Sequence, residues 1–200
     1  MISTILLIRH GQTDGNVNEY FTGLGDADLN EEGFKQVKEL SARLSLLPLS
    51  AVYSSPLRRT LATAEMIAEP HGISPQIVDD LIEIDLGDWQ GLHKNQVEEW
   101  WPELRKQSLI DPSHITLPNG ESFSQVTERA IRALNTIESF GEEHMAVVTH
   151  EVIVKVLVAY VLGVSNSIYR KLDISNASVT TVNVDESNRR LITLNDISHL

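Results

Sequence analysis

The sequence of 200 residues contains no cysteine. This absence excludes disulfide bonds, thiolate metal sites and the chemistry of phosphatases that use a cysteine nucleophile. A chain without cysteine also suits a reducing compartment, and we therefore expect a cytoplasmic protein. The length and a hydrophobic content of 42% are those of one globular domain with a substantial core.

Positive charge is scarce. Sixteen Lys and Arg residues stand against 28 Asp and Glu residues, which gives a formal net charge of -12, and no run of basic residues interrupts the acidic background. We therefore expect neither a nucleic acid nor a membrane surface as a partner. An anion that binds this chain has to be held by a local group of cations.

Long apolar runs are also missing. The most apolar segment, residues 152–162, contains Lys155 and is much shorter than the roughly 20 residues that span a membrane. We predict that this segment is a buried helix. Arg9 interrupts the apolar run near the start of the sequence, so we expect no secretory signal there.

Short apolar runs alternate with helical patterns along the chain. Residues 4–8, 51–54 and 145–149 are runs typical of strands that are covered on both faces. Apolar residues at helical spacing predict helices over residues 57–68, over 123–137, after His150, and between the N-cap Asn30 and Pro48. In the helix after Asn30, the expected buried positions are Phe34, Val37, Leu40, Leu44 and Leu47. This order predicts an α/β fold, a three-layer sandwich around a mainly parallel sheet.

The last part of the chain departs from this alternation. Residues 177–184 and 191–194 favour strands, and the turn-forming residues 185–188 separate them, so we expect a C-terminal antiparallel hairpin. No linker or repeat divides the chain, which predicts a single domain over residues 1–200. Residues 91–120 are the least regular segment and are expected to form a lid or specificity insertion. We expect Trp89, Trp100 and Trp101 to pack under this insertion.

Basic side chains lie at the ends of three predicted strands. His10 follows the first strand, His150 follows residues 145–149, and Arg59 lies in the first turn of the helix after residues 51–54. The carboxyl ends of parallel strands share one edge of a sheet, and ligands bind there. Together with Arg9, these side chains predict a cationic pocket that suits a phosphate dianion.

Five blocks of the sequence resemble the histidine phosphatase superfamily, the phosphoglycerate mutase-like proteins. They occur in the order of that family and extend over nearly the whole chain. The blocks are RHGQT from Arg9 followed by Asn16, SPLRRT from Ser55, EIDLGDWQG from Glu83, PNGES from Pro118 and VTH from Val148.

The resemblance implies a phosphomonoesterase that acts on small phosphorylated metabolites without a metal ion or a cofactor. His10 is then the nucleophile, which takes up the phosphoryl group as phosphohistidine. Glu83 is the implied proton donor to the leaving group and later the base for water. The implied contacts of the phosphate oxygens are Arg9, Arg59 and His150, and Asn16 and Gly23 match positions along the phosphate pocket.

The chain departs from the family pattern at a few positions. Glu151 and Val152 stand where most relatives have two glycines, and Gln12 stands where RHGET has its glutamate. Phosphoserine phosphatases of the family have a substrate-recognising histidine three residues after the glutamate, and here that residue is Leu86. This disfavours phosphoserine, and α-ribazole phosphate and sugar phosphates stay open as substrates.

Two other functions stay open as well. A cofactor-dependent phosphoglycerate mutase needs further cations for a second anionic group. The segment that would supply them offers only His93, Lys94, Arg105, Lys106 and Arg129, so we favour the phosphatase. A noncatalytic protein that binds phosphate esters is disfavoured because all of the implied catalytic residues are present. The oligomeric state, a homodimer included, is left open.

Overall fold

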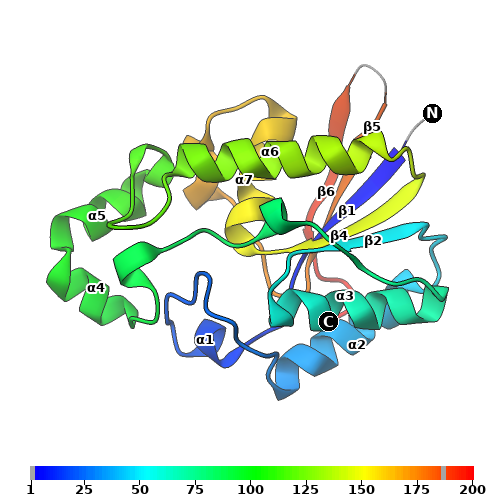
Figure 1. Cartoon of the computed structure of the whole chain (residues 1–200), viewed down its shortest axis with the longest axis horizontal. Coiled ribbons are helices and arrows are strands. Elements are labelled where there is room, and N and C mark those ends of the chain that lie inside the picture. The colour runs from blue at the N-terminus through cyan, green and yellow to red at the C-terminus, as the bar shows by residue number, and fades with distance from the viewer. Residues whose placement is uncertain (1–2, 186–187) are drawn as a thin grey trace.

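A six-stranded sheet forms the centre of the computed structural model, which describes residues 3–185 and 188–200 (Figure 1). The strand order is β3 (Gln76–Ile77), β2 (Ala51–Ser54), β4 (His144–Thr149), β1 (Ser3–Arg9), β5 (Val179–Val184) and β6 (Arg189–Asp196). Strands β1 to β4 run parallel, whereas β5 is antiparallel to both β1 and β6. The predicted parallel sheet and C-terminal hairpin are confirmed, although turn residues 186 and 187 lie outside the described residues.

Helices cover both faces of this sheet, as the three-layer prediction requires (Figure 1). Helices α2 (Glu31–Leu44) and α3 (Arg58–Ala68) pack on one face, and α6 (Phe123–Ser139) and α7 (Glu151–Leu162) pack on the other. Side chains of β1 alternate between the two cores, since Leu6 and Ile8 join the first and Ile5 and Leu7 the second. Burial on both faces explains why the strand sequence is a continuous apolar run.

The start of α2 confirms one prediction and corrects another. The Asn30 side chain caps the helix by accepting a hydrogen bond from the Gly33 N–H at 2.8 Å. Phe34, which we expected in the core, is 48% exposed. Gly33 faces the core in its place, and a Cβ there would lie 2.1 Å from the carbonyl oxygen of Gln12. Leu47 is also exposed, because the helix ends at Leu44 and does not continue to Pro48.

The segment between α3 and α6 is built largely of short helices, and within it residues 91–120 are more regular than expected. It contains η1 (Glu69–His71), η2 (Asp79–Leu81), η3 (Gly87–Trp89), α4 (Lys94–Trp100), α5 (Pro102–Ile110) and η4 (Pro112–His114). Trp89 is buried and Trp101 is half-buried against the same core. Trp100 is 55% exposed, and the centroid of its ring lies 5.9 Å from that of Trp101. The expectation for Trp100 was therefore wrong.

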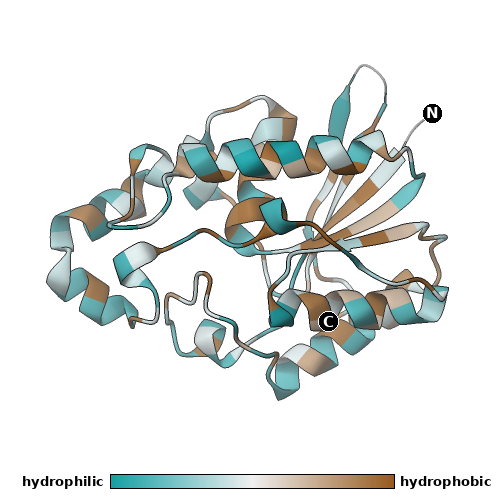
Figure 2. Cartoon of the chain, viewed as in Figure 1, coloured by the Kyte–Doolittle hydropathy of each residue, from teal (hydrophilic) through white to brown (hydrophobic). Residues whose placement is uncertain are grey.

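The remaining short helices, α1 (Asp14–Val17) and η5 (Asn166–Lys171), lie in the connections that follow β1 and α7. Figure 2 shows polar and apolar residues alternating around α6, as expected for a helix with one face on the core. In contrast, α7 is buried continuously from Val152 to Ala159. No helix in the described ranges is both long and apolar enough to cross a membrane.

Candidate active site

His10 and His150 lie side by side because their strands are neighbours. In the β1–β4 ladder Arg9 is paired with Thr149, so the next residue of each strand emerges at the same edge of the sheet. The main-chain N–H of His10 donates to the carbonyl oxygen of Thr149 at 3.0 Å. The two imidazole rings meet at an angle of 62° with 5.3 Å between their centroids. The predicted meeting of the two histidines is confirmed.

The His10 ring is buried and held in one tautomer. Its Nδ1 lies 2.7 Å from the carbonyl oxygen of Gly11, which can only accept, so Nδ1 carries the proton and Nε2 keeps its lone pair. Burial, followed by the charges of Arg59 and Arg9, holds the pKa of His10 well below its usual value. The ring is therefore neutral at physiological pH, with a nucleophilic Nε2.

His150 is fully enclosed and bound on one side. Its Nε2 lies 2.7 Å from Ser55 Oγ, and its Nδ1 is buried with no hydrogen-bond partner in the described part of the chain. Burial and the charge of Arg59 lower the pKa of His150 well below its usual value. His150 does not line the cavity described below but lies against the His10 ring, which does.

A cavity of about 300 Å³ opens in front of His10. Its walls include six of the seven residues that we predicted for the site, namely Arg9, His10, Asn16, Gly23, Arg59 and Glu83. Asn16 Oδ1 accepts from the Thr13 N–H and from Asn176 Nδ2, which fixes the orientation of the amide. Asn176 was not among the residues that we predicted for the site.

Two arginines flank His10 in this cavity. The buried guanidinium of Arg59 donates to the carbonyl oxygens of Gly25 at 2.6 Å and Gly23 at 2.8 Å, which fixes its position. Arg9 donates to the carbonyl oxygen of Ile174 and pairs with Glu151 at 3.0 Å. Two guanidinium groups beside a neutral imidazole give the cavity a cationic end in an acidic protein.

Glu151 begins α7, as expected, and is also part of the cavity wall. Besides the ion pair with Arg9, its carboxylate lies 2.6 Å from Nζ of the buried Lys155. Burial raises the pKa of Glu151, but the charges of Arg9 and Lys155 outweigh it, so the net shift is downward. This glutamate therefore stays ionised and partly neutralises Arg9.

Glu83 faces the same cavity from the loop after η2. Its Oε1 accepts a hydrogen bond from the Ile84 N–H at 2.8 Å. Burial raises the pKa of this carboxyl above its usual value, and the Ile84 N–H and Arg59 oppose the rise only in part. A carboxyl with a raised pKa beside a nucleophile can donate a proton to a leaving group.

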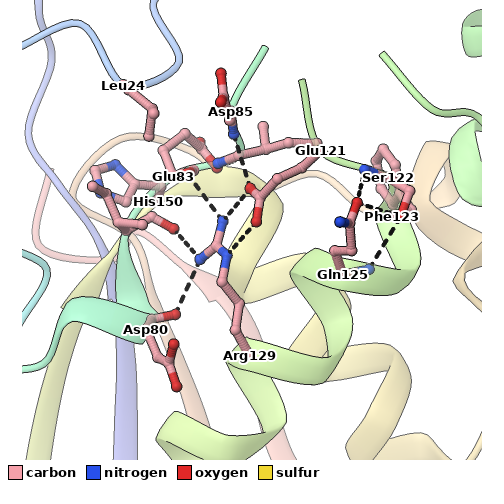
Figure 3. A network of polar contacts seen from close by, with 12 residues as sticks. Leu24, Asp80, Glu83, Asp85, Glu121, Ser122, Phe123, Gln125, Arg129 and His150 are labelled. Atoms are coloured by element: carbon pink, nitrogen blue, oxygen red, sulfur yellow. Dashed lines mark hydrogen bonds and ion pairs between the residues drawn. The ribbon is translucent and has the colours of Figure 1, made fainter. Parts of the chain in front are cut away.

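A buried ion pair holds the Glu83 loop in place, which the sequence analysis missed (Figure 3). Arg129 of α6 binds both carboxylate oxygens of Glu121 at 2.8 Å and donates to the carbonyl oxygens of Asp80 and Glu83, each at 3.0 Å. Glu121 also accepts from the Asp85 N–H. Arg129 therefore supports the loop and does not line the cavity. We had expected it among the cations available for a second anionic group, and that expectation was wrong.

Two further arginines, Arg105 of α5 and Arg170 of η5, line the cavity. We had expected few cations for a second anionic group, and for this cavity that expectation was wrong. Arg105 was noted in the sequence, whereas Arg170 lies in a stretch without motif or periodicity that would have singled it out. The cavity therefore has further positive charge beyond the end formed by Arg9, His10 and Arg59.

Comparisons with known proteins show which proteins this chain is similar to. The family model described as histidine phosphatase superfamily (branch 1) matches residues 5–197. Phosphoserine phosphatase 1 of Hydrogenobacter thermophilus is 33% identical over 98% of this chain and 93% of its own length. The metal-independent phosphoserine phosphatase of Arabidopsis thaliana is 33% identical over 100% of this chain and 84% of its own. The structure of Bacillus stearothermophilus YhfR superposes with a TM-score of 0.94 at 30% identity and covers 98% of both chains.

Proposed function

Because this chain belongs to the histidine phosphatase superfamily and is a phosphatase of small phosphorylated substrates, we propose that it transfers the phosphoryl group to His10 without a metal ion. The observation that carries the proposal is the neutral His10 ring. Its Nδ1–H is hydrogen-bonded to the Gly11 carbonyl, its Nε2 has no hydrogen-bond partner among the described residues, and Arg9 and Arg59 line the same cavity. A similarity to a relative named as metal-independent supports the same mechanism.

The cationic end of the cavity binds the phosphate group. Arg9 and Arg59 present planar donor groups that match the nonbridging oxygens, and they stabilise the charge that these oxygens carry during transfer. Arg59 is already fixed by two backbone carbonyls, so little conformational entropy is lost when the substrate binds. We assign the amide of Asn16 and the backbone at Gly23 to the same group. His150, which is fully buried and does not line the cavity, acts through its contact with the His10 ring instead.

In the first step, His10 Nε2 forms a bond to phosphorus while the bond from phosphorus to the ester oxygen breaks. The leaving oxygen takes the proton of Glu83, and the alcohol departs. The Gly11 carbonyl accepts a hydrogen bond from Nδ1–H throughout, which stabilises the positive charge that develops on the ring.

In the second step, the Glu83 carboxylate takes a proton from a water molecule whose oxygen attacks phosphorus. The bond between phosphorus and His10 Nε2 breaks. Inorganic phosphate is released, and the imidazole returns to its neutral form. Glu83 ends the cycle protonated, as it began. Its raised pKa suits both roles, since it donates a proton first and recovers one later.

For the substrate, the two relatives named as phosphoserine phosphatases make phosphoserine the first compound to test. Leu86 lines the cavity where such enzymes were expected to have a histidine, so serine recognition here needs other groups. We propose that residues 91–120 determine specificity, because α5 in this segment contributes Arg105 to the cavity. A cytoplasmic location stays a prediction, and the oligomeric state, a homodimer included, stays open.

The test is a comparison of purified variants. His10→Ala should lower kcat for p-nitrophenyl phosphate by several orders of magnitude, whereas His144→Ala, at the opposite end of β4, should keep the wild-type rate. Wild-type turnover should also persist in excess chelator. Loss of activity on chelation with recovery in magnesium, or a folded His10→Ala variant at near-normal rate, would overturn the proposal.

A further inference from the structure

Arg105 and Arg170 converge on one residue, Ser108 of α5. Arg170 donates through Nε and Nη2 to the carbonyl oxygen of Ser108 at 2.9 and 2.8 Å. Arg105 Nη1 donates to Ser108 Oγ at 3.4 Å. The two guanidinium groups therefore come from distant parts of the chain, and both line the cavity that holds His10.

Their positive charges are poorly neutralised. Within residues 3–185 and 188–200, Arg170 has no carboxylate at ion-pair distance, and Arg105 has only Glu98, which lies 3.5 Å from Nε. Burial and then the charge of Arg170 lower the pKa of Arg105. Holding two like charges together costs free energy that a bound anion would recover.

The position of the pair relates it to the leaving group. A smaller recess of about 80 Å³ adjoins the main cavity, and both are lined by Arg105 and Arg170. The two cavities also share Phe21, Ile84 and Leu86, whereas Arg9, His10 and Glu83 line the main cavity alone. The arginine pair thus lies on the part of the cavity wall that continues into the smaller recess, where Arg9, His10 and Glu83 do not reach.

We propose that Arg105 and Arg170 bind a carboxylate on the leaving group, so that the preferred substrates are phosphate esters of small hydroxy acids. The N–H groups of Arg105 and Arg170 that do not bind Ser108 or Glu98 can donate to the oxygens of one carboxylate, and a cavity of about 300 Å³ suits a small substrate. The apolar side chains of Phe21 and Leu86 then contact the carbon atoms between the two charged ends. The inference rests on the proposed function, because it takes the phosphate end of the cavity as given.

Matched substrates isolate the carboxylate. O-Phospho-L-serine differs from O-phosphoethanolamine only by a carboxylate, and 3-phosphoglycerate differs from 2-hydroxyethyl phosphate in the same way. We expect kcat/KM to be at least about tenfold higher for the carboxylate member of one or both pairs. A hydrogen bond between charged groups contributes a free energy that corresponds to about this factor. Equal values within both pairs would overturn the inference.

Variants then locate the effect. Arg105→Gln and Arg170→Gln should each reduce the ratio of kcat/KM within the preferred pair by about tenfold or more. Arg170→Lys should retain part of the ratio, since it keeps the charge but loses the fork. Arg190→Gln, at an exposed arginine of β6, is the matched control and should leave the ratio unchanged. Variants that lower both members of a pair equally would contradict a carboxylate site.

Two readouts keep the outcomes separate. The wild-type ratios decide the inference even if Arg170→Gln, which removes the contacts with Ser108, unfolds the protein. Hydrolysis of p-nitrophenyl phosphate, whose leaving group has no carboxylate, reports on the proposed function alone. If this hydrolysis depends on His10 while the carboxylate preference is absent, only the arginine site is wrong. If it does not depend on His10, the proposed function fails first.

Discussion

The guanidinium of Arg129 binds both carboxylate oxygens of Glu121 and also donates to the main-chain carbonyl of Glu83 at 3.0 Å. One buried ion pair therefore connects α6 to the loop that carries the proposed proton donor. The arginine side chain is only 9% exposed, so its charge depends on this partner. We place Arg129 and Glu121 as positioning residues, which act on the reaction through Glu83.

Glu121→Gln should destabilise the protein, because it leaves the buried Arg129 charge without its counterion. We expect a loss of about 3 kcal/mol in the free energy of unfolding, measured by urea denaturation. The carboxylate accepts hydrogen bonds from Arg129 and the Asp85 N–H, which outweigh burial and lower the pKa of Glu121. The stabilisation is therefore present above the carboxyl pKa of the unfolded chain and is lost as the pH falls through the lowered folded value.

A positioning role makes a kinetic prediction as well. Glu121→Gln should lower kcat/KM for alkyl phosphates more than for p-nitrophenyl phosphate, since only the former need a well-placed proton donor. Glu128→Gln, at a neighbouring exposed position of α6, is the matched control for stability and for both substrates. A loss of stability with equal kinetic losses would assign the ion pair a purely structural role.

Replacement of the proposed proton donor Glu83 should lower the rate of hydrolysis by an amount that depends on the leaving group of the substrate. Glu83→Gln is expected to slow the hydrolysis of an alkyl phosphate by about 10²- to 10⁴-fold. The first transfer from p-nitrophenyl phosphate should be affected far less, because the phenolate leaves without a proton. The rate of nitrophenolate release in a stopped-flow burst measures this step. Equal losses on both substrates would mean that Glu83 is not the acid.

The pH profile follows from opposite shifts of two groups. His10 must be neutral, and burial lowers its pKa, so kcat/KM should fall on the acidic side only well below pH 6.5. Glu83 must be protonated, and burial raises its pKa, so kcat/KM for alkyl phosphates should decrease as the pH rises through that raised value. For p-nitrophenyl phosphate the alkaline decrease should be weak. The same alkaline limb for both substrates would contradict the assignment of Glu83.

Hydrolysis should dominate over phosphoryl return to the alcohol. Once the leaving alcohol departs, a cavity of about 300 Å³ has room for water, and Glu83 lies there to deprotonate it. We expect 3-phosphoglycerate to yield glycerate and inorganic phosphate, with and without 2,3-bisphosphoglycerate. Rapid formation of 2-phosphoglycerate that exceeds phosphate release would favour the mutase.

The sequence predicted most of the residues that meet at the His10 end of the cavity. Continuous apolar runs show where β1 and β4 end, and a parallel sheet brings those ends together. The proximity of His10 and His150 could therefore be predicted from the sequence. The hydrogen bond from His10 to Gly11 could not be predicted, because it depends on the backbone conformation after the strand.

Other features required the three-dimensional arrangement. Arg170 reaches the cavity from a short 3₁₀-helix, whose sequence has no periodic pattern. The sequence identified Arg129 as a cation, but its partner Glu121 could not be predicted. Spacing alone predicted Phe34 in the core, yet the close approach of Gly33 to Gln12 turns the helix so that Phe34 points outward. Apolar spacing identifies a helix, but the rotation of that helix depends on what it packs against.

Trapping the phosphoenzyme tests the central claim most directly. In Glu83→Gln, p-nitrophenyl phosphate can still phosphorylate the enzyme, whereas the base that activates water is missing, so the intermediate should accumulate. Alkaline quenching followed by peptide mapping by mass spectrometry should find the phosphoryl group on His10 and none in the double variant with His10→Ala. A phosphoryl group on another residue, or steady turnover by Glu83→Gln with no phosphoenzyme, would contradict the account.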